Sequence, residues 1–245
     1  MLRHSGLVSW VIVDRVDKAN SLDYRHAREL ASSIRGACGN DGSRLVALRG
    51  AGDRFFSTGI DLGVVAGFKD DVIDTIMDGV RGVFNAIDDC GKPVVAAVNG
   101  HALGLGFELV LASDMAVAVE WARLGVPAAR WGMIPPITST VGPVLLGLKQ
   151  ASLLAYTGRA VDASEAVRLG IVNSVAGSID DMESWVYTVA SEVSKSSQWA
   201  VAEARRLARR ILREVMEMGL TSLALSASRD EARERARRFF EDRRR

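Results

Sequence analysis

Two glycine-bearing loops hold the residues of this chain whose types and spacing best suit chemistry. The first covers residues 50–62 and reads GAGDRFFSTGIDL, and the second covers residues 98–109 and reads VNGHALGLGFEL. Each follows a short apolar run that predicts a strand. Glycine permits backbone shapes that direct N–H groups into a cleft, and a helix start adds unpaired donors with partial positive charge. The loops therefore predict a binding site of backbone N–H donors, with two ordinary tight turns as the alternative.

The second loop does not match the glycine motifs that bind nucleotides. Gly104-Leu105-Gly106 lacks the third glycine of the dinucleotide fingerprint, and the sequence contains no GxxxxGK[ST] phosphate loop. A GxSxG nucleophile motif is also missing from the sequence. These absences argue against hydride transfer and against serine hydrolysis.

The spacing of apolar residues predicts how the two loops are held. We expect strands over residues 7–13, 45–48, 93–98, 114–119 and 171–175, and helices over residues 23–38, 70–88, 179–193, 199–218 and 229–241, with a short helix from Phe107. Asn20 or Ser21 is expected to cap the first helix. The alternation predicts an α/β core over residues 1–175 and a helical region over residues 176–245. Ligands of such folds bind at the C-terminal ends of strands, where both loops fall.

Composition sets broad limits on the function. The chain has 245 residues, 48% of them apolar and 25% charged, which suits one large domain. A net charge of +1 provides no global field for nucleic acid or an acidic membrane. The Arg-rich C-terminal stretch alternates with Glu and Asp, which favours a solvated helix face.

Compartment and redox state are predicted from what the sequence lacks. It has no apolar stretch of membrane-spanning length, and its first residues run directly into a strand pattern, so we expect a cytoplasmic protein without a signal peptide. Cys38 and Cys90 have no metal-ligand spacing. We expect two buried free thiols, with a disulfide as the alternative.

Several linked motifs resemble the crotonase superfamily, the enoyl-CoA hydratase/isomerase family. FFSTGIDL followed by KPVVAAVNGHALGLGFELVLASDMAVA is similar to its two signature segments. TGRAVDASEAVRLGIVNSV, DEARERARRFFEDRR and RVDKANSL resemble its later segment, its C-terminal helix and its first CoA-contacting turn. The resemblance covers nearly the whole chain. It implies an α/β crotonase spiral of ββα units, with a C-terminal helical region that covers CoA and assembles trimers or pairs of trimers.

The resemblance also implies an oxyanion hole. The backbone N–H groups of Ile60 and Leu105 would bond the thioester oxygen as an enolate forms, each contributing roughly 10²–10³ in rate. Leu105 stands where the family usually has glycine. The implied contacts to substrate and CoA are made by Thr58, Ile60, Asp61, Leu62, Gly63 and Leu105, with Arg15, Lys18, Arg243 and Arg244 in reach of CoA phosphates or simply solvated.

The resemblance places Glu108 where hydratases carry the first of two catalytic glutamates. Burial among apolar neighbours should raise its pKa towards a value suited to proton transfer. Ala128 occupies the place of the second glutamate, and Pro136-Ile137-Thr138-Ser139-Thr140 replaces the glycine-rich stretch that usually follows. His101 and Arg130 are secondary candidates, with packing or a surface charge as the alternatives, and Asp114 is expected to be structural.

The predicted function is that of an enoyl-CoA hydratase that converts a 2-enoyl-CoA to a 3-hydroxyacyl-CoA. The missing second glutamate keeps two alternatives open: an enoyl-CoA isomerase with a single glutamate, and an acyl-CoA-binding protein without turnover. Nucleic-acid binding would depend only on the Arg-rich tail. No metal and no cofactor are expected, because coenzyme A is part of the substrate.

Overall fold

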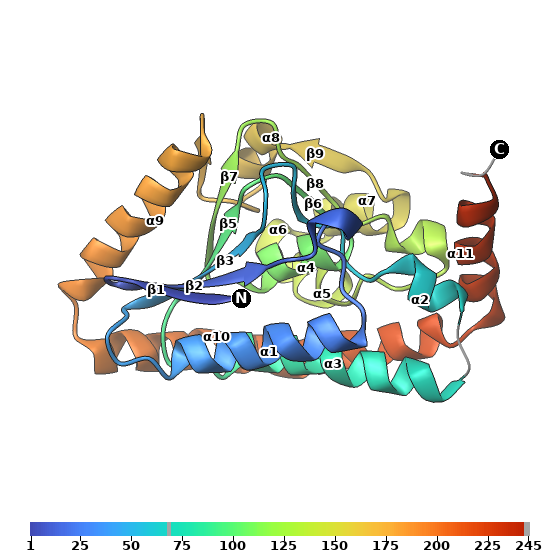
Figure 1. The fold of residues 1–245 in the computed structure, drawn as a ribbon, viewed down its shortest axis with the longest axis horizontal. Coiled ribbons are helices and arrows are strands. Elements are labelled where there is room, and N and C mark those ends of the chain that lie inside the picture. The colour runs from blue at the N-terminus through green and yellow to red at the C-terminus, as the bar shows by residue number, and fades with distance from the viewer. Residues whose placement is uncertain (68–69, 243–245) are drawn as a thin grey trace.

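Two β-sheets form the centre of the fold (Figure 1). The structure is a computed structural model that describes residues 1–67 and 70–242, with the backbone alone for residues 70–76. The larger sheet has the order β1-β2-β3-β5-β7-β10. Its strands are β1 (Leu2–Ser5), β2 (Val8–Val13), β3 (Leu45–Gly50), β5 (Val94–Val98), β7 (Met115–Val119) and β10 (Ser174–Ala176). All neighbours pair in parallel except β1 and β2, which form an antiparallel edge.

The inner strands β2, β3, β5 and β7 of the larger sheet are mostly apolar and buried, because helices cover both faces. All five residues of β5 are buried, as a central parallel strand requires. Leu48 of β3 lies opposite Val11 of β2 on one side and Ala96 of β5 on the other. This register brings the C-terminal ends of β3 and β5 together, so that the two glycine loops leave the sheet side by side.

A smaller sheet continues from those loops in the order β4-β6-β8-β9. Its strands are β4 (Phe55–Ser57), β6 (His101–Leu103), β8 (Arg123–Gly125) and β9 (Ala160–Asp162). The sequence did not predict these strands, and neither did it predict β1. Strands of three or four residues are too short for an alternating pattern to emerge. The smaller sheet ties the first loop to the second through the parallel pair β4 and β6.

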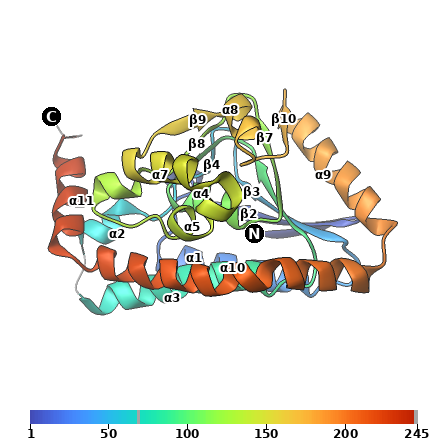
Figure 2. The same ribbon diagram turned by 180° about the vertical axis from the view of Figure 1, so that it is seen from behind.

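Helices pack on both sides of the larger sheet. The helices of the described residues are η1 (Val16–Lys18), α1 (Tyr24–Cys38), α2 (Leu62–Ala66), α3 (Asp70–Asp88), α4 (Leu105–Ala112), η2 (Pro127–Trp131), α5 (Pro136–Thr140), α6 (Gly142–Leu146), α7 (Leu148–Thr157), α8 (Ala163–Arg168), α9 (Ile179–Ser194), α10 (Gln198–Ala227) and α11 (Asp230–Asp242). Helices α1, α3 and α10 run side by side along one side, whereas α9 lies on the other and α11 stands at the end of the molecule (Figures 1 and 2). No helix in the described ranges is long and apolar enough to cross a membrane.

The cap of the first long helix corrects one expectation. Asp23 caps α1 by accepting a hydrogen bond of 2.9 Å from the N–H of His26. Asn20 and Ser21 do not cap it. The backbone of Asn20 is left-handed, with φ of 54°, and its side chain bonds elsewhere. A side chain that braces a loop has the same residue type as a helix cap, so the sequence pattern alone could not separate the two roles.

Two buried arginines on α10 bind Asp114, which directly precedes β7, and Asp88, which ends α3. The Nε of Arg205 donates to Asp114 Oδ2 at 2.7 Å, and the Nη1 of Arg209 donates to Asp114 Oδ1 at 2.9 Å. Arg209 also pairs with Asp88 at 2.8 Å. The other N–H groups of Arg205 donate to backbone oxygens of Ile87, Asp88 and Cys90. Asp114 is thus structural, as the sequence predicted.

The expectation of two free thiols is wrong, because Cys38 and Cys90 form a disulfide. Cys38 ends α1, and Cys90 follows the end of α3. The side-by-side packing of α1 and α3 brings the two Cα atoms to 5.4 Å. The sequence showed two cysteines but not this packing, which is what decides whether they can pair.

Loss of this disulfide should destabilise the protein. The bond closes a loop with a sequence separation of 52. Its removal in a Cys38→Ser/Cys90→Ser variant should lower the free energy of unfolding by about 4 kcal/mol, because the unfolded chain gains entropy. Urea unfolding with and without reductant measures this effect. The double variant, which serves as the control, should not respond to reductant. A parent protein whose stability is the same in both conditions would contradict the prediction.

Candidate active site

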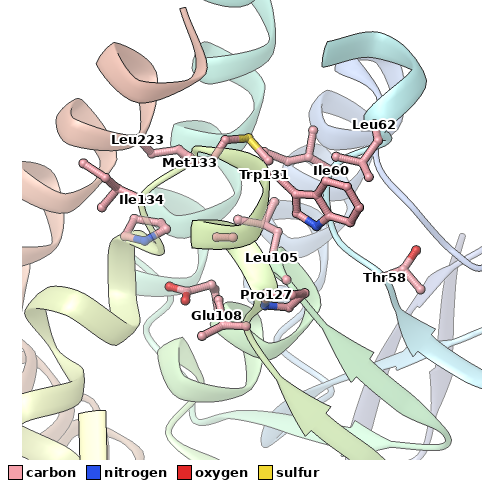
Figure 3. A pocket seen from close by; sticks show the side chains of 14 residues that line it. Thr58, Ile60, Leu62, Leu105, Glu108, Pro127, Trp131, Met133, Ile134 and Leu223 are labelled. Atoms are coloured by element: carbon pink, nitrogen blue, oxygen red, sulfur yellow. The ribbon is translucent and has the colours of Figure 1, made fainter. Parts of the chain in front are cut away.

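A small apolar cavity lies where the two glycine loops meet (Figure 3). Its volume is about 80 Å³. Five of the predicted site residues line it: Thr58, Ile60, Leu62, Leu105 and Glu108. The rest of its wall comes mainly from η2, from the loop that follows η2 and from Leu223 of α10. The structure therefore brings together the core of the predicted site from segments far apart in the sequence.

Two backbone donors meet at this cavity. Leu22 holds Ile60 in place, because its N–H donates to Gly59 O at 2.7 Å and its carbonyl accepts from Asp61 N at 2.9 Å. Gly59 has φ of 87°, and a Cβ there would lie 2.4 Å from the N of Leu105. Only glycine allows this approach. Neither the Ile60 nor the Leu105 N–H donates to an acceptor within residues 1–67 and 70–242, so both are available to a ligand.

The first loop is braced by a side chain that the sequence did not single out for this role. The Nδ2 of Asn20 donates to Ala51 O at 3.0 Å and to Phe55 O at 2.8 Å. Ser57 Oγ in turn donates to Asn20 O at 2.8 Å. A Cβ at Gly106 would lie 2.2 Å from Ser57 O, so glycine at this position lets α4 pack directly on β4. These contacts fix both donors before any substrate arrives.

Glu108 is the acidic group of the cavity, and it is 1% exposed. Its Oε1 accepts from Thr138 Oγ1 at 2.6 Å. Its Oε2 accepts from Thr138 N at 3.0 Å and also from Ile137 N. Burial raises the pKa of Glu108 to about 7, and the hydrogen bonds from Thr138 and Ile137 oppose this rise. A raised pKa is what the sequence predicted from the apolar neighbours of Glu108. With a pKa of about 7, the carboxyl group is partly protonated and partly ionised near neutral pH.

The site has no second carboxylate among the described residues that line it. Ala128 lines the cavity at the position where the resemblance implied a second glutamate. Thr138, which the sequence showed only as part of an unusual segment, is fully buried behind Glu108. The signal that could have identified Thr138 is the replacement of a glycine-rich stretch by hydroxyl-bearing residues.

The predicted CoA-contacting residues have partners within the chain. Arg15 pairs with Asp61 at 2.9 Å and with Asp23 at 3.5 Å. Asp61 also caps α2 by accepting from Gly63 N at 2.9 Å. These contacts lie next to the cavity and order the loop after Ile60. Their role towards CoA stays a prediction.

Thr58 and Lys18 are placed differently from each other. The N–H and the Oγ1 of Thr58 both donate to Ala19 O at 3.2 Å. A backbone contact from Thr58 to a ligand would thus have to use its carbonyl. Lys18 is exposed on η1 and does not line the cavity.

Two secondary candidates lie outside the cavity. His101 accepts a hydrogen bond of 3.1 Å from Arg123 N and packs edge-on against Phe55, and burial lowers its pKa. Arg130 donates to Thr157 O at 3.1 and 2.9 Å. These contacts agree with the packing and surface alternatives. Arg243 and Arg244 lie outside the described residues.

A metal ion would need several side chains in the described part of the chain that could bind it together. No group of three or more His, Cys, Asp or Glu side chains there could hold a metal ion. The polar groups that this cavity presents are its two N–H donors and the carboxyl group of Glu108.

Comparison with known proteins gives consistent results. Residues 4–244 match the model of a family described as enoyl-CoA hydratase/isomerase. A carnitinyl-CoA dehydratase of Proteus mirabilis is 33% identical over 205 residues, which cover 83% of this chain and 77% of the relative. The carnitinyl-CoA dehydratase of Salmonella typhi is 34% identical over 209 residues, covering 85% and 79%.

Solved structures extend the match to the fold. An enoyl-CoA hydratase/isomerase from Mycobacterium paratuberculosis superposes with a TM-score of 0.86 at 27% identity, covering 97% of each chain. An enoyl-CoA hydratase from Bacillus halodurans reaches a TM-score of 0.88 at 21% identity, covering 97% of this chain and 98% of its own. The latter likeness concerns the fold alone. The expected spiral fold with its helical C-terminal region is thus confirmed.

Proposed function

We propose that this chain, which belongs to the enoyl-CoA hydratase/isomerase family, hydrates a 2-enoyl-CoA to a 3-hydroxyacyl-CoA with Glu108 as its one acid–base group. The chain is an enzyme of the lyase or isomerase type that acts on acyl-CoA. The geometry of the cavity supports the finer assignment, to hydration by a single carboxylate.

The reaction can be balanced with one carboxylate. The ionised Glu108 accepts a proton from a water molecule while the water oxygen bonds to C3 of the substrate. The electrons of the C2–C3 double bond move onto the thioester oxygen, where the N–H groups of Ile60 and Leu105 stabilise the enolate. Glu108 then returns the proton to C2. Each proton and electron pair is accounted for without a second glutamate or a cofactor.

The observation that carries this proposal is the buried carboxyl group of Glu108 in the same cavity as the N–H groups of Ile60 and Leu105, which have no acceptor within the described residues. Burial also raises the pKa of Glu108 to about 7. A group with this pKa accepts and donates a proton with similar ease near neutral pH, which is the condition for efficient general acid–base catalysis. A carboxyl group with an ordinary pKa would return the proton poorly.

Ala128 favours a second candidate, enoyl-CoA isomerisation. Isomerisation moves a proton between C2 and C4 of the acyl chain. This step needs one mobile base and the oxyanion hole, but no bound water. Loss of turnover with retained acyl-CoA binding is the third possibility that the missing carboxylate opens.

Assembly and location belong to the same proposal. We propose a homotrimer or a pair of trimers, and exposed apolar side chains such as Val144, Leu148 and Tyr156 supply surface that an interface would cover. We also propose a cytoplasmic location, although disulfides are rare in the cytosol. Coenzyme A is part of the substrate, and the proposed reaction uses no other cofactor.

Turnover of a four-carbon 2-enoyl-CoA in heavy-oxygen water tests the function. The labelled oxygen should appear at C3 of a 3-hydroxyacyl-CoA. Conversion of a 3-enoyl-CoA without uptake of the label would identify the isomerase instead. A saturating acyl-CoA should also stabilise the folded state, by about 2.7 kcal/mol at a hundred times its Kd. Stabilisation without turnover on either series would identify a binding protein, and the absence of both would overturn the proposal.

A further inference from the structure

Two apolar side chains, Ile134 and Leu223, form the wall at one end of the cavity. In Figure 3, Thr58 lies on one side of Leu105, and Ile134 and Leu223 lie on the other. If the Ile60 and Leu105 donors hold the thioester oxygen, CoA extends towards Thr58 and the acyl chain extends towards Ile134 and Leu223. The direction assigned to the acyl chain therefore rests on the proposed function.

The wall is tied to the long helix α10. The N–H of Ile134 donates to Ser226 Oγ at 3.0 Å, and Ser226 Oγ donates to Leu223 O at 2.9 Å. A Cβ at Gly219 would lie 2.3 Å from Pro136 O, so the helix backbone and the loop are in direct contact. Leu223 is 3% exposed. Ile134 is 38% exposed, so Leu223 is the part of the wall that cannot retreat from a longer chain without losing these contacts.

The space in front of the wall is short. An apolar protein cavity of about 150 Å³ holds benzene, which corresponds to roughly 25 Å³ per carbon. The cavity of about 80 Å³ therefore holds about three to four carbons. A four-carbon acyl group fills it, whereas a ten-carbon chain would have to displace the side chain of Leu223 or Ile134.

The lining also selects against a charged chain. Glu108 is the one titratable side chain among the described lining residues, and three hydrogen bonds take three of the about four acceptor positions of its carboxylate. Trp131 is the one aromatic side chain of the lining, and its ring packs edge-on against Phe239 at 5.0 Å. A quaternary ammonium is recognised by a cage of aromatic faces, which this lining lacks. A carnitinyl group carries such an ammonium and exceeds the space in size.

We propose that the cavity selects an uncharged acyl chain of about four carbons, and that Leu223 and Ile134 set this limit. The assignment separates this chain in substrate range from the relatives that are named carnitinyl-CoA dehydratases. The two wall residues determine specificity and do not touch the reacting atoms.

Binding of saturated acyl-CoAs, which cannot react, tests the limit independently of catalysis. Calorimetry on the full chain should show butyryl-CoA binding at least about tenfold tighter than decanoyl-CoA or carnitinyl-CoA. In Leu223→Ala, the ratio of decanoyl to butyryl affinity should rise at least about tenfold, the size of effect that a few methylenes produce in an apolar pocket. Turnover of the matching 2-enoyl-CoAs should shift in the same direction.

Leu225→Ala is the matched control, because Leu225 lies two residues further along α10 and is 67% exposed. Its chain-length ratio should equal that of the parent. Ile134→Ala provides a second test at the wall if Leu223→Ala does not fold. A parent that binds decanoyl-CoA or carnitinyl-CoA as tightly as butyryl-CoA would overturn the inference and leave the proposed function intact. Equal ratios in parent and wall variants would also overturn it. A parent that binds no acyl-CoA would overturn the proposed function itself.

Discussion

Glu108→Gln is expected to lower turnover of an enoyl-CoA by about 10²–10⁴-fold, the usual contribution of general acid–base catalysis. Glutamine keeps the shape of the buried side chain and can still accept hydrogen bonds from Thr138 and Ile137 through its amide oxygen. It cannot carry a proton near neutral pH. Acyl-CoA binding and the fold should therefore persist, so that kcat falls much more than the affinity for butyryl-CoA.

The pH profile sharpens this test. Because the ionised carboxyl group starts the reaction, the kcat/KM of the parent should rise with pH through about 7, the pKa of Glu108. Thr138→Val removes a hydrogen bond that lowers this pKa, so its profile should move to higher pH, and Thr138→Ser should restore it. Glu120→Gln, an exposed carboxyl group, is the control. Parent-like turnover in Glu108→Gln would refute the mechanism.

The titration of Glu108 should also make the free energy of unfolding depend on pH. The folded state raises the pKa of Glu108 from 4.5 to about 7, so the folded protein binds a proton more tightly than the unfolded chain does. The contribution of this group is therefore most favourable below about 4.5, and it declines as the pH rises to about 7. Glu108→Gln should lack this decline.

Arg205→Met should lower the free energy of unfolding by about 3–5 kcal/mol, which makes it the most damaging single change we expect outside the cavity. The guanidinium of Arg205 is almost fully buried and bonds to Asp114 and to three backbone oxygens. Methionine fills a similar volume but donates no hydrogen bond. The oxygens left behind remain buried, and Asp114 keeps the ion pair with Arg209 and the hydrogen bond from Val94 N.

Urea unfolding of Arg205→Met beside Arg206→Met measures this effect. Arg206 is the next residue on α10, but it is exposed and pairs with Glu203 on the same helix. Its replacement should leave the unfolding midpoint unchanged within error. Equal losses in the two variants would show that the buried ion network contributes nothing special.

The sequence predicted the long elements well and the short ones poorly. The helix expected over residues 70–88 has these bounds in the structure, because a long apolar repeat has few alternative explanations. Helix α10 continues to Ala227, well past the expected end at Met218, although Gly219 directly follows that residue. This glycine does not end the helix but lets it pack against Pro136, whose carbonyl oxygen would lie 2.3 Å from a Cβ at Gly219. The strands of the smaller sheet escaped detection because they pair through the tertiary fold and not through a pattern of their own.

The candidate site also contains residues that the sequence predicted and residues that it did not. Ile60, Leu105 and Glu108 could be placed from linked motifs, because glycine spacing and residue type belong to the sequence. Thr138 could not be placed, because its contact with Glu108 spans thirty positions and depends on how α5 packs beside α4. The partner of Cys38 escaped prediction for the same reason.

Helix α10 joins two parts of the molecule that have so far been treated separately. This one rod of 30 residues carries Arg205 near its start and Leu223 near its end, about 27 Å apart at 1.5 Å per residue. A tilt of one degree about the arginine anchor moves Leu223 by about 0.5 Å by this lever length. If Leu223 limits the acyl chain as proposed, a substitution at the arginine anchor would change substrate range from a place that touches no substrate atom.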